Sequence, residues 1–196
     1  MSLCIDASRS WPDQLYTRIR AYPPIMLAYL NQGGDGNRVL LDGLGPSALS
    51  RIDRDILSQP HVKHVILFEG VNDIGVAEAT RTAQDAIVHN LIVGYKQIIT
   101  RVRALDLKIY GATITPFGGH HSYDDGGLRE ASRQAVNMWI RQSYAFDAVL
   151  EFDKALRDPK NATQLTPIFD SGDHLHPNPA GYRQIAEAVP LELLAL

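Results

Sequence analysis

The run His64-Val65-Ile66-Leu67-Phe68-Glu69-Gly70-Val71-Asn72-Asp73 indicates the fold class most directly. Its first six residues are mainly apolar, and Gly70 marks the turn at which the apolar run ends. A short, continuous apolar run is typical of a strand in a parallel sheet, because such a strand is buried on both faces. We therefore predict a buried parallel strand that leads directly into a polar loop.

Strands and helices alternate on both sides of this run. The sequence predicts further strands at 25–30, 108–114 and 148–152, and helices at 13–22, 47–58, 81–105, 128–144 and from Ala180 onwards. This alternation implies right-handed crossovers and a mostly parallel sheet that is covered on both sides. No repeat or linker interrupts the pattern. We therefore expect one α/β domain over residues 1–196, a three-layer sandwich with a sheet of about five strands.

Composition narrows the class of protein further. The 196 residues are 45% hydrophobic, which suits one well-buried domain, and a net charge of -3 argues against a nucleic-acid partner. No apolar run approaches the roughly 20 residues that a membrane span needs. Cys4 is the single cysteine, so an internal disulfide is excluded. No secretory signal is visible, so we expect secretion if an upstream signal peptide has been lost and a cytoplasmic location otherwise.

Polar motifs follow the predicted strands, at the sheet edge where ligands bind in open α/β sheets. Asp173-His174-Leu175-His176 lies before the last helix, and Asp173 is placed to orient the imidazole of His176 as a general base. Gly36 and Asn72 stand in two other loops of this edge. A backbone N–H and a side-chain amide are suitable donors for an oxyanion, which points to acyl transfer.

These motifs, in this order, resemble the sequence blocks of the SGNH (GDSL-type) ester hydrolase superfamily. The matching blocks are the glycine loop 31–36, Gly-x-Asn-Asp at 70–73 and Asp-x-x-His at 173–176 followed by Pro177-Asn178. Further matches at 11–13, 37–38, 115–120 and 171–173 bring the chain close to the branch of acetylxylan-esterase-like proteins.

The resemblance implies a flavodoxin-like strand order and a serine esterase that needs no cofactor. The implied substrates are small acyl esters, including acetylated carbohydrate. Carried over by motif, His176 is the base, Asp173 orients it, and Gly36 and Asn72 are the oxyanion donors.

The block that should carry the nucleophile is missing from the sequence. In the family a strand followed by Gly-Asp-Ser precedes Trp11, but the ten residues before Trp11 contain no glycine. Ser2, Ser8 and Ser10 are the hydroxyls in that segment, and Asp6-Ala7-Ser8 has neither the spacing nor the glycine of the block. The sequence therefore does not identify the nucleophile. We expect that the chain is truncated before residue 1 and that the chain as given is inactive.

The missing strand also creates a folding problem. In the implied strand order it lies between the second and third strands, so its absence leaves two rows of backbone groups without partners. The slot can close, take up residues 3–6, or accept a strand from another copy. We favour exchange with another copy, and therefore a homodimer, because exposed edges recruit strands.

Two other functions stay open. One is a non-catalytic relative that binds carbohydrate or ester groups. The other is a dinucleotide-binding oxidoreductase, because Gly43-Leu44-Gly45-Pro46-Ser47-Ala48 fits G-x-G-x-x-A and Glu69 follows a later strand. Pro46 counts against this second function, since it removes an N–H from the turn that cradles the pyrophosphate.

Histidines in the loops raise the question of a metal site. His120, His121, His174 and His176 lie in two loops with Asp173. Adjacent histidines on an extended chain point apart, which suits a metal ion poorly. We therefore expect loop histidines without a metal.

Overall fold

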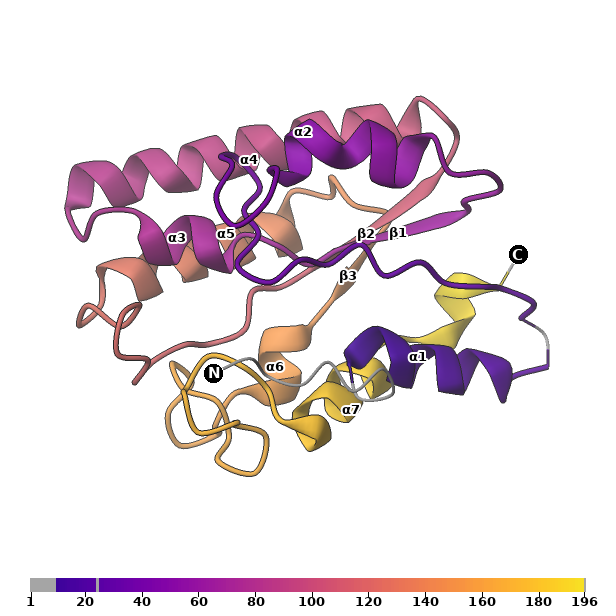
Figure 1. The fold of residues 1–196 in the computed structure, drawn as a ribbon. Coiled ribbons are helices and arrows are strands. Elements are labelled where there is room, and N and C mark those ends of the chain that lie inside the picture. The colour runs from indigo at the N-terminus through magenta and orange to yellow at the C-terminus, as the bar shows by residue number, and fades with distance from the viewer. Residues whose placement is uncertain (1–9, 24, 196) are drawn as a thin grey trace.

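Three parallel strands form the centre of the structure, a computed structural model that describes residues 10–23 and 25–195 (Figure 1). They are β1 (His64–Leu67), β2 (Lys108–Ala112) and β3 (Ala148–Leu150), paired in the order β1-β2-β3. Val65 pairs with Ile109 across the first ladder, and Tyr110 pairs with Ala148 across the second. The prediction of a parallel α/β sheet is confirmed.

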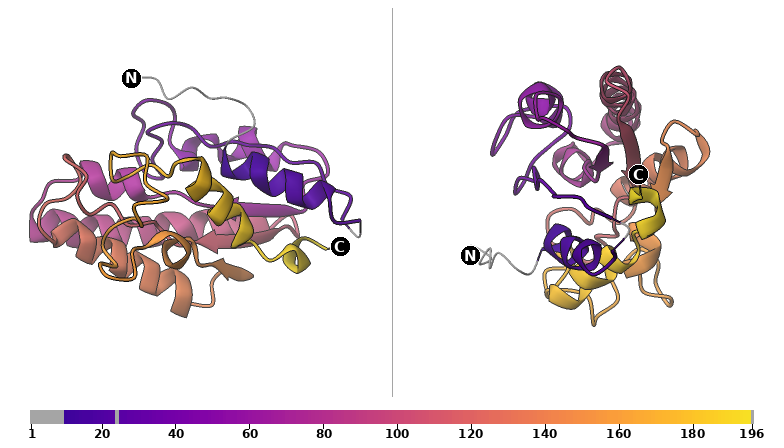
Figure 2. Two further views of the ribbon diagram at one scale, coloured as in Figure 1. Left: turned by 90° about the horizontal axis from the view of Figure 1, so that it is seen from below. Right: turned by 90° about the vertical axis from the view of Figure 1, so that its right-hand side faces the viewer.

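Helices cover both faces of this sheet, which gives the predicted three layers (Figures 1 and 2). One face carries α2 (Ala48–Ile52) with the π-helical turn η1 (Asp53–Leu57), α3 (Val71–Val76), α4 (Arg81–Arg103) and α5 (Leu128–Gln142). The other face carries α1 (Trp11–Arg20), α6 (Phe152–Leu156), α7 (Pro179–Glu187) and the 3₁₀ turn η2 (Leu191–Leu194). Strand side chains alternate between the two cores: Ile109 joins the first and Tyr110 the second.

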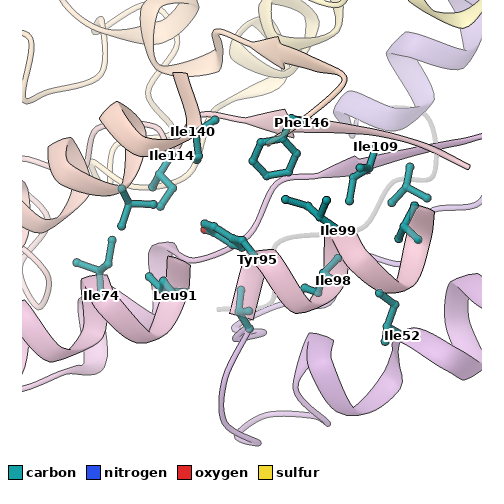
Figure 3. Close-up of a cluster of buried hydrophobic side chains, with 14 of the residues drawn as sticks. Ile52, Ile74, Leu91, Tyr95, Ile98, Ile99, Ile109, Ile114, Ile140 and Phe146 are labelled. Atoms are coloured by element: carbon teal, nitrogen blue, oxygen red, sulfur yellow. The ribbon is translucent and has the colours of Figure 1, made fainter. Parts of the chain in front are cut away.

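Helix α4 supplies the largest share of the first core (Figure 3). The side chain of Thr80 accepts a hydrogen bond from the N–H of Ala83 and so caps the helix start. Buried residues recur at helical spacing along one face of the helix: Leu91, Tyr95, Ile98 and Val102. This single apolar face holds α4 against the sheet, and the opposite face is exposed.

The described residues hold three strands, fewer than the predicted five or so. Residues 25–30 are extended and alternate in burial, with Ile25 buried and Met26 93% exposed, but they pair with no strand. A period of two satisfies the packing of one face, whereas a strand also needs a neighbour for its backbone groups. Among the described strands β1 pairs with β2 alone, so the slot has not closed. The predicted insertion of residues 3–6 lies outside the described residues, and the homodimer stays a prediction.

Two short helices were not predicted from the sequence. Helix α3 starts at Val71 and α6 at Phe152, and both follow strands directly. With six and five residues they are too short to show a helical period. No helix in the described part of the chain is both long enough and apolar enough to span a membrane.

Glu69, two residues after the end of β1, carries a largely buried carboxyl group. Its backbone carbonyl accepts a hydrogen bond from the hydroxyl of Tyr95, 2.7 Å away. Burial raises the pKa of the Glu69 side chain to about 7, the nearby Arg51 guanidinium lowers it, and Asp73 raises it. The Arg51 Nη2 to Glu69 Oε1 distance is 3.8 Å, so the ion pair does not offset the loss of water around the carboxylate.

The raised pKa of Glu69 predicts that stability falls as the pH rises. In the unfolded chain this carboxyl ionises near its ordinary value of 4.5, whereas in the folded chain it keeps its proton until about pH 7. Between these values the free energy of unfolding falls as the pH rises, and above about pH 7 the loss is complete. Glu69→Gln removes this loss, so its stability relative to the parent should be greater at pH 8 than at pH 4.5, by on the order of 2 kcal/mol.

Urea unfolding of the parent and of Glu69→Gln at the two pH values measures this difference. Glu187→Gln, at an exposed position at the end of α7, is the matched control and should leave the pH dependence unchanged. Equal pH profiles for the parent and Glu69→Gln contradict the prediction.

Candidate active site

Asp173 organises the loop that enters α7 and holds His176. Its Oδ1 atom accepts hydrogen bonds from the backbone N–H groups of Leu175 and His176, at 3.0 and 2.8 Å. Its Oδ2 atom lies 2.6 Å from Nδ1 of His176. Helix α7 then begins at Pro179, with the Asn178 side chain accepting hydrogen bonds from two N–H groups of the first turn. The Asp-x-x-His spacing thus brings the predicted carboxylate and imidazole into contact.

The electrostatics of this pair suit a general base. Burial raises the pKa of Asp173, but the hydrogen bonds from the His176 ring and backbone and from the Leu175 backbone hold it well below its usual range. An ionised Asp173 accepts the Nδ1 hydrogen of His176, which leaves Nε2 as the nitrogen that can take up a proton.

The loops of Gly36 and Asn72 are joined through Asn37, the residue after Gly36. The Asn72 side-chain Nδ2 donates to the Asn37 carbonyl over 2.8 Å, and Asn37 N–H closes a turn on the Gly34 carbonyl. Gly36 has φ +65°, a left-handed conformation that glycine adopts without strain. Within the described part of the chain, no hydrogen bond from Gly36 N–H to another residue is found.

Tyr123 is a site residue that the sequence analysis missed. Its hydroxyl donates to Oδ1 of Asn72 over 2.9 Å, which fixes the Asn72 amide with its NH₂ group toward Asn37. The Tyr123 ring lies so close to Gly75 that a Cβ there would be 2.4 Å from it. No sequence motif identifies Tyr123, because its role depends on the loop after β2 folding over α3.

His120 connects the two halves of the site. Its ring packs edge-on to Tyr123 with centroids 4.8 Å apart, and its Nδ1 atom accepts the N–H of Tyr123 at 3.1 Å. Burial lowers the pKa of His120, and His121 lowers it further; Asp173 raises it, and His176 and His174 lower it. His120 therefore lies within electrostatic range of the Asp173–His176 pair as well as beside the Tyr123 that holds Asn72.

A second connection runs through Tyr182 on α7. Burial raises the pKa of Tyr182, and the carboxylates of Asp173 and Asp35 raise it further. Asp35 stands next to Gly36 in the chain. The loop of the predicted base and the loop of the predicted oxyanion donors thus both approach this tyrosine.

Arg51 fixes the loop that carries Gly36. Its guanidinium donates to the Gln32 carbonyl over 2.6 Å, to Asn37 Oδ1 over 2.9 Å and to Asp55 Oδ2 over 2.9 Å. Arginine suits such a node because its five N–H donors have a rigid arrangement. The sequence gives no signal for this residue, since it lies in α2 and reaches back to a loop that precedes it.

The sequence analysis identified no nucleophile, and in the structure no described serine hydroxyl contacts His176. Ser10 caps α1, and its Oγ donates to the Asp13 carboxylate. Ser171 Oγ lies 3.0 Å from Asp173 Oδ1, on the carboxylate rather than on the base. Ser2 and Ser8 lie outside the described residues.

The structure also bears on the dinucleotide-binding fold and on the metal site that the sequence analysis considered. Val39 and Leu40, which would have to form the first strand of a dinucleotide fold, direct their N–H groups to the Asp73 carboxylate and form no strand. Residues 10–23 and 25–195 contain no group of three or more His, Cys, Asp or Glu side chains that could hold a metal ion.

Comparison with solved structures finds proteins of similar fold. Acetylxylan esterase Axe2 from Geobacillus stearothermophilus has 17% identity, and the match covers 95% of this chain and 81% of Axe2 with a TM-score of 0.69. A G-D-S-L family protein from Desulfitobacterium hafniense DCB-2 has 18% identity, with coverage of 94% and 89% and a TM-score of 0.65. At these identities the likeness shows a shared fold and no more. A search of curated proteins gives no match.

The family itself follows from the sequence match. The model of the GDSL-like lipase/acylhydrolase family matches residues 2–184, nearly the whole chain. The chain belongs to the GDSL-like lipase/acylhydrolase family.

The Tyr123 hydroxyl predicts a measurable contribution to stability. In Tyr123→Phe the Oδ1 atom of Asn72 loses its donor, so we expect a loss of roughly 0.5–1.5 kcal/mol in the free energy of unfolding. Urea denaturation measures it, with Tyr144→Phe as the control because Tyr144 is 91% exposed. The NMR signals of the Asn72 side-chain amide should also move in Tyr123→Phe. Unchanged Asn72 signals argue against this contact.

Proposed function

We propose that this chain carries the base and the oxyanion donors of a serine ester hydrolase for small acyl esters. The observation that supports the proposal is the Asp173–His176 hydrogen bond of 2.6 Å, at the carboxyl ends of the strands. The family of the chain consists of lipases and acylhydrolases. The paired loops of Gly36 and Asn72 add two donor groups of the type that acyl transfer needs.

The chemistry assigned to these residues has two halves. As a serine hydroxyl attacks the ester carbonyl, Nε2 of His176 takes its proton, and the Asp173 carboxylate stabilises the imidazolium that forms. Gly36 N–H and the Asn72 amide donate hydrogen bonds to the carbonyl oxygen as it becomes negative. His176 then gives the proton to the departing alcohol. Water repeats the sequence on the acyl-enzyme and releases the acid.

We further propose acetylated carbohydrate as the natural substrate class. Structural neighbours include proteins named as acetylxylan esterases, such as Axe2. The surroundings of the Asp173–His176 pair include polar side chains, with His120 and Tyr123 in the loop after β2 and Tyr182 on α7. Such a surface suits a hydroxyl-rich alcohol and a short acyl group better than a long acyl chain, which needs apolar contacts.

No described serine hydroxyl contacts His176, so we expect the 196-residue chain to turn over p-nitrophenyl acetate very slowly. A triad without its nucleophile keeps only binding and oxyanion stabilisation. A variant in which a strand ending in Gly-Asp-Ser is placed before Trp11 should recover activity. Steady-state kinetics of both proteins test this. Strong turnover by the 196-residue chain that Ser8→Ala or Ser10→Ala abolishes contradicts the missing nucleophile.

In the variant with Gly-Asp-Ser, the assigned residues can be tested one at a time. Asn72→Ala should cost roughly 2.7–4 kcal/mol of transition-state stabilisation, with the loss in kcat, as for one oxyanion donor in other hydrolases. His176→Ala should abolish turnover, whereas His121→Ala, at an exposed neighbour of His120, is the control and should retain it. Full activity of Asn72→Ala contradicts its role.

A non-catalytic binding protein is the second candidate, and the lack of a described serine at His176 favours it. In that case the Gly-Asp-Ser variant stays inactive while acetylated xylo-oligosaccharide still binds. Calorimetric titration beside the kinetic assay separates this outcome from the proposed ester hydrolase.

A further inference from the structure

A second Asp–His pair lies in the same loop as the Asp173–His176 pair. Nδ1 of His174 is 2.6 Å from Oδ2 of Asp170, and the Oδ1 atom of Asp170 accepts the N–H groups of Gly172 and His174 at 2.8 and 3.0 Å. The Asp170 side chain is only 9% exposed, whereas that of His174 is 52% exposed. The imidazole is thus held by a buried carboxylate while half of it faces solvent.

The backbone at His174 is in a conformation that side chains disfavour. Its φ is +64°, in the left-handed region where glycine is at ease and other residues are strained. The hydrogen bonds that shape the loop use backbone N–H groups and Asp170, so a glycine at 174 could make all of them except the ring contact. The loop therefore does not need an imidazole for its own fold. Strained conformations cluster at functional sites, although they also occur elsewhere in this chain, as at His61 with φ +60°.

The His174 ring lies against the loop after β2. A Cβ added to Gly119 would be 3.3 Å from Cγ of His174 and 3.5 Å from Nε2 of Gln164, so glycine at 119 leaves room for both side chains. His174 also lies within electrostatic range of His120, as do Asp173 and His176. The ring is therefore held at the rim of the proposed active site, beside the base.

We propose that His174 binds a hydroxyl group in the alcohol half of the ester, and so sets the preference for sugar esters. This inference rests on the proposed function. With Nδ1 donating to Asp170, Nε2 of the neutral ring is an acceptor for a hydroxyl hydrogen. The Gln164 amide beside it offers N–H donors.

Charge and polarity select this ligand class over the others. Three carboxylates surround the rim: Asp170, Asp173 and Asp124, whose Oδ2 accepts Gly119 N–H over 2.7 Å. They repel an anionic alcohol group or a free acid. An acyl chain finds polar neighbours here rather than apolar ones. A neutral group with several hydroxyls fits the donors, the acceptor and the charge of this rim.

Xylobiose is the probe, because it is an alcohol half that no esterase can hydrolyse. We expect the Cε1–H signal of His174 to shift saturably as xylobiose is added, and not with sodium acetate. In His174→Gly the Kd for xylobiose should rise about tenfold, the effect of one hydrogen bond near 1.4 kcal/mol. His174→Gly relieves the strained φ but removes the ring donor of the Asp170 carboxylate, so the fold of both His174 variants is checked by circular dichroism before binding is measured.

His61→Gly is the matched control, since His61 is an exposed histidine with φ +60° just before β1, at the opposite end of the strand from the site. It should relieve strain in the same way and leave xylobiose binding unchanged. His174→Asn tolerates the left-handed conformation but is too short to reach the ligand, so it should bind as weakly as His174→Gly.

Three outcomes overturn the inference: no saturable binding of xylobiose by the parent, unchanged binding in both His174 variants, or an equal loss in His61→Gly. None of these outcomes bears on turnover of p-nitrophenyl acetate by the Gly-Asp-Ser variant, so failure here and failure of the proposed esterase function are distinguishable.

Discussion

The carboxylate of Asp73 ties the loop after residue 36 to the start of α3, and the proposed oxyanion donors depend on this contact. Its two oxygens accept the N–H groups of Val39 and Leu40, at 2.8 and 3.0 Å. Burial raises the pKa of Asp73, and these backbone hydrogen bonds oppose that rise. A buried carboxylate that accepts two N–H groups is costly to disturb, because each partner left alone remains desolvated. Asp73 thereby holds the segment that follows Asn37, whose carbonyl accepts a hydrogen bond from the Asn72 side chain.

The two buried acids of this region, Asp73 and Glu69, differ in how well their carboxylates are paired. Asp73 satisfies backbone groups of a segment that forms no strand, while Glu69 lies next to it with a pKa raised to about 7. Nη2 of Arg51 lies 3.8 Å from Oε1 of Glu69, whereas the guanidinium makes shorter hydrogen bonds to Gln32 and Asn37 in the loop that carries Gly36. The arrangement favours a fixed loop over an optimal ion pair. That is the pattern expected where geometry for a ligand matters more than stability.

The sequence was informative where a residue acts within its own neighbourhood. The apolar run before Gly70 predicted β1, and Asp-x-x-His predicted the contact of Asp173 with His176, because both depend on spacings of a few residues. Tyr123 and Arg51 were not found, since their partners are 51 and 14 residues away and no local pattern marks them. Residues 25–30 show the opposite case. They were predicted to form a strand because they are apolar, and in the structure they are extended but are not a strand. Pairing depends on a neighbouring strand, which the apolar character of the segment does not reveal.

Among the described residues, one edge of β1 has no neighbouring strand and no serine hydroxyl contacts His176, the proposed base. Val65 packs into the first core and Ile66 and Phe68 against the second, so β1 is covered on both faces although it pairs on one side alone among the described strands. Coverage of both faces is typical of an inner strand. A parallel strand along that edge would end beside Gly70 and Asn72, at the carboxyl ends where the loop of His176 also lies. The position that would complete the backbone pairing of β1 is therefore also the position from which a hydroxyl could approach Nε2 of His176.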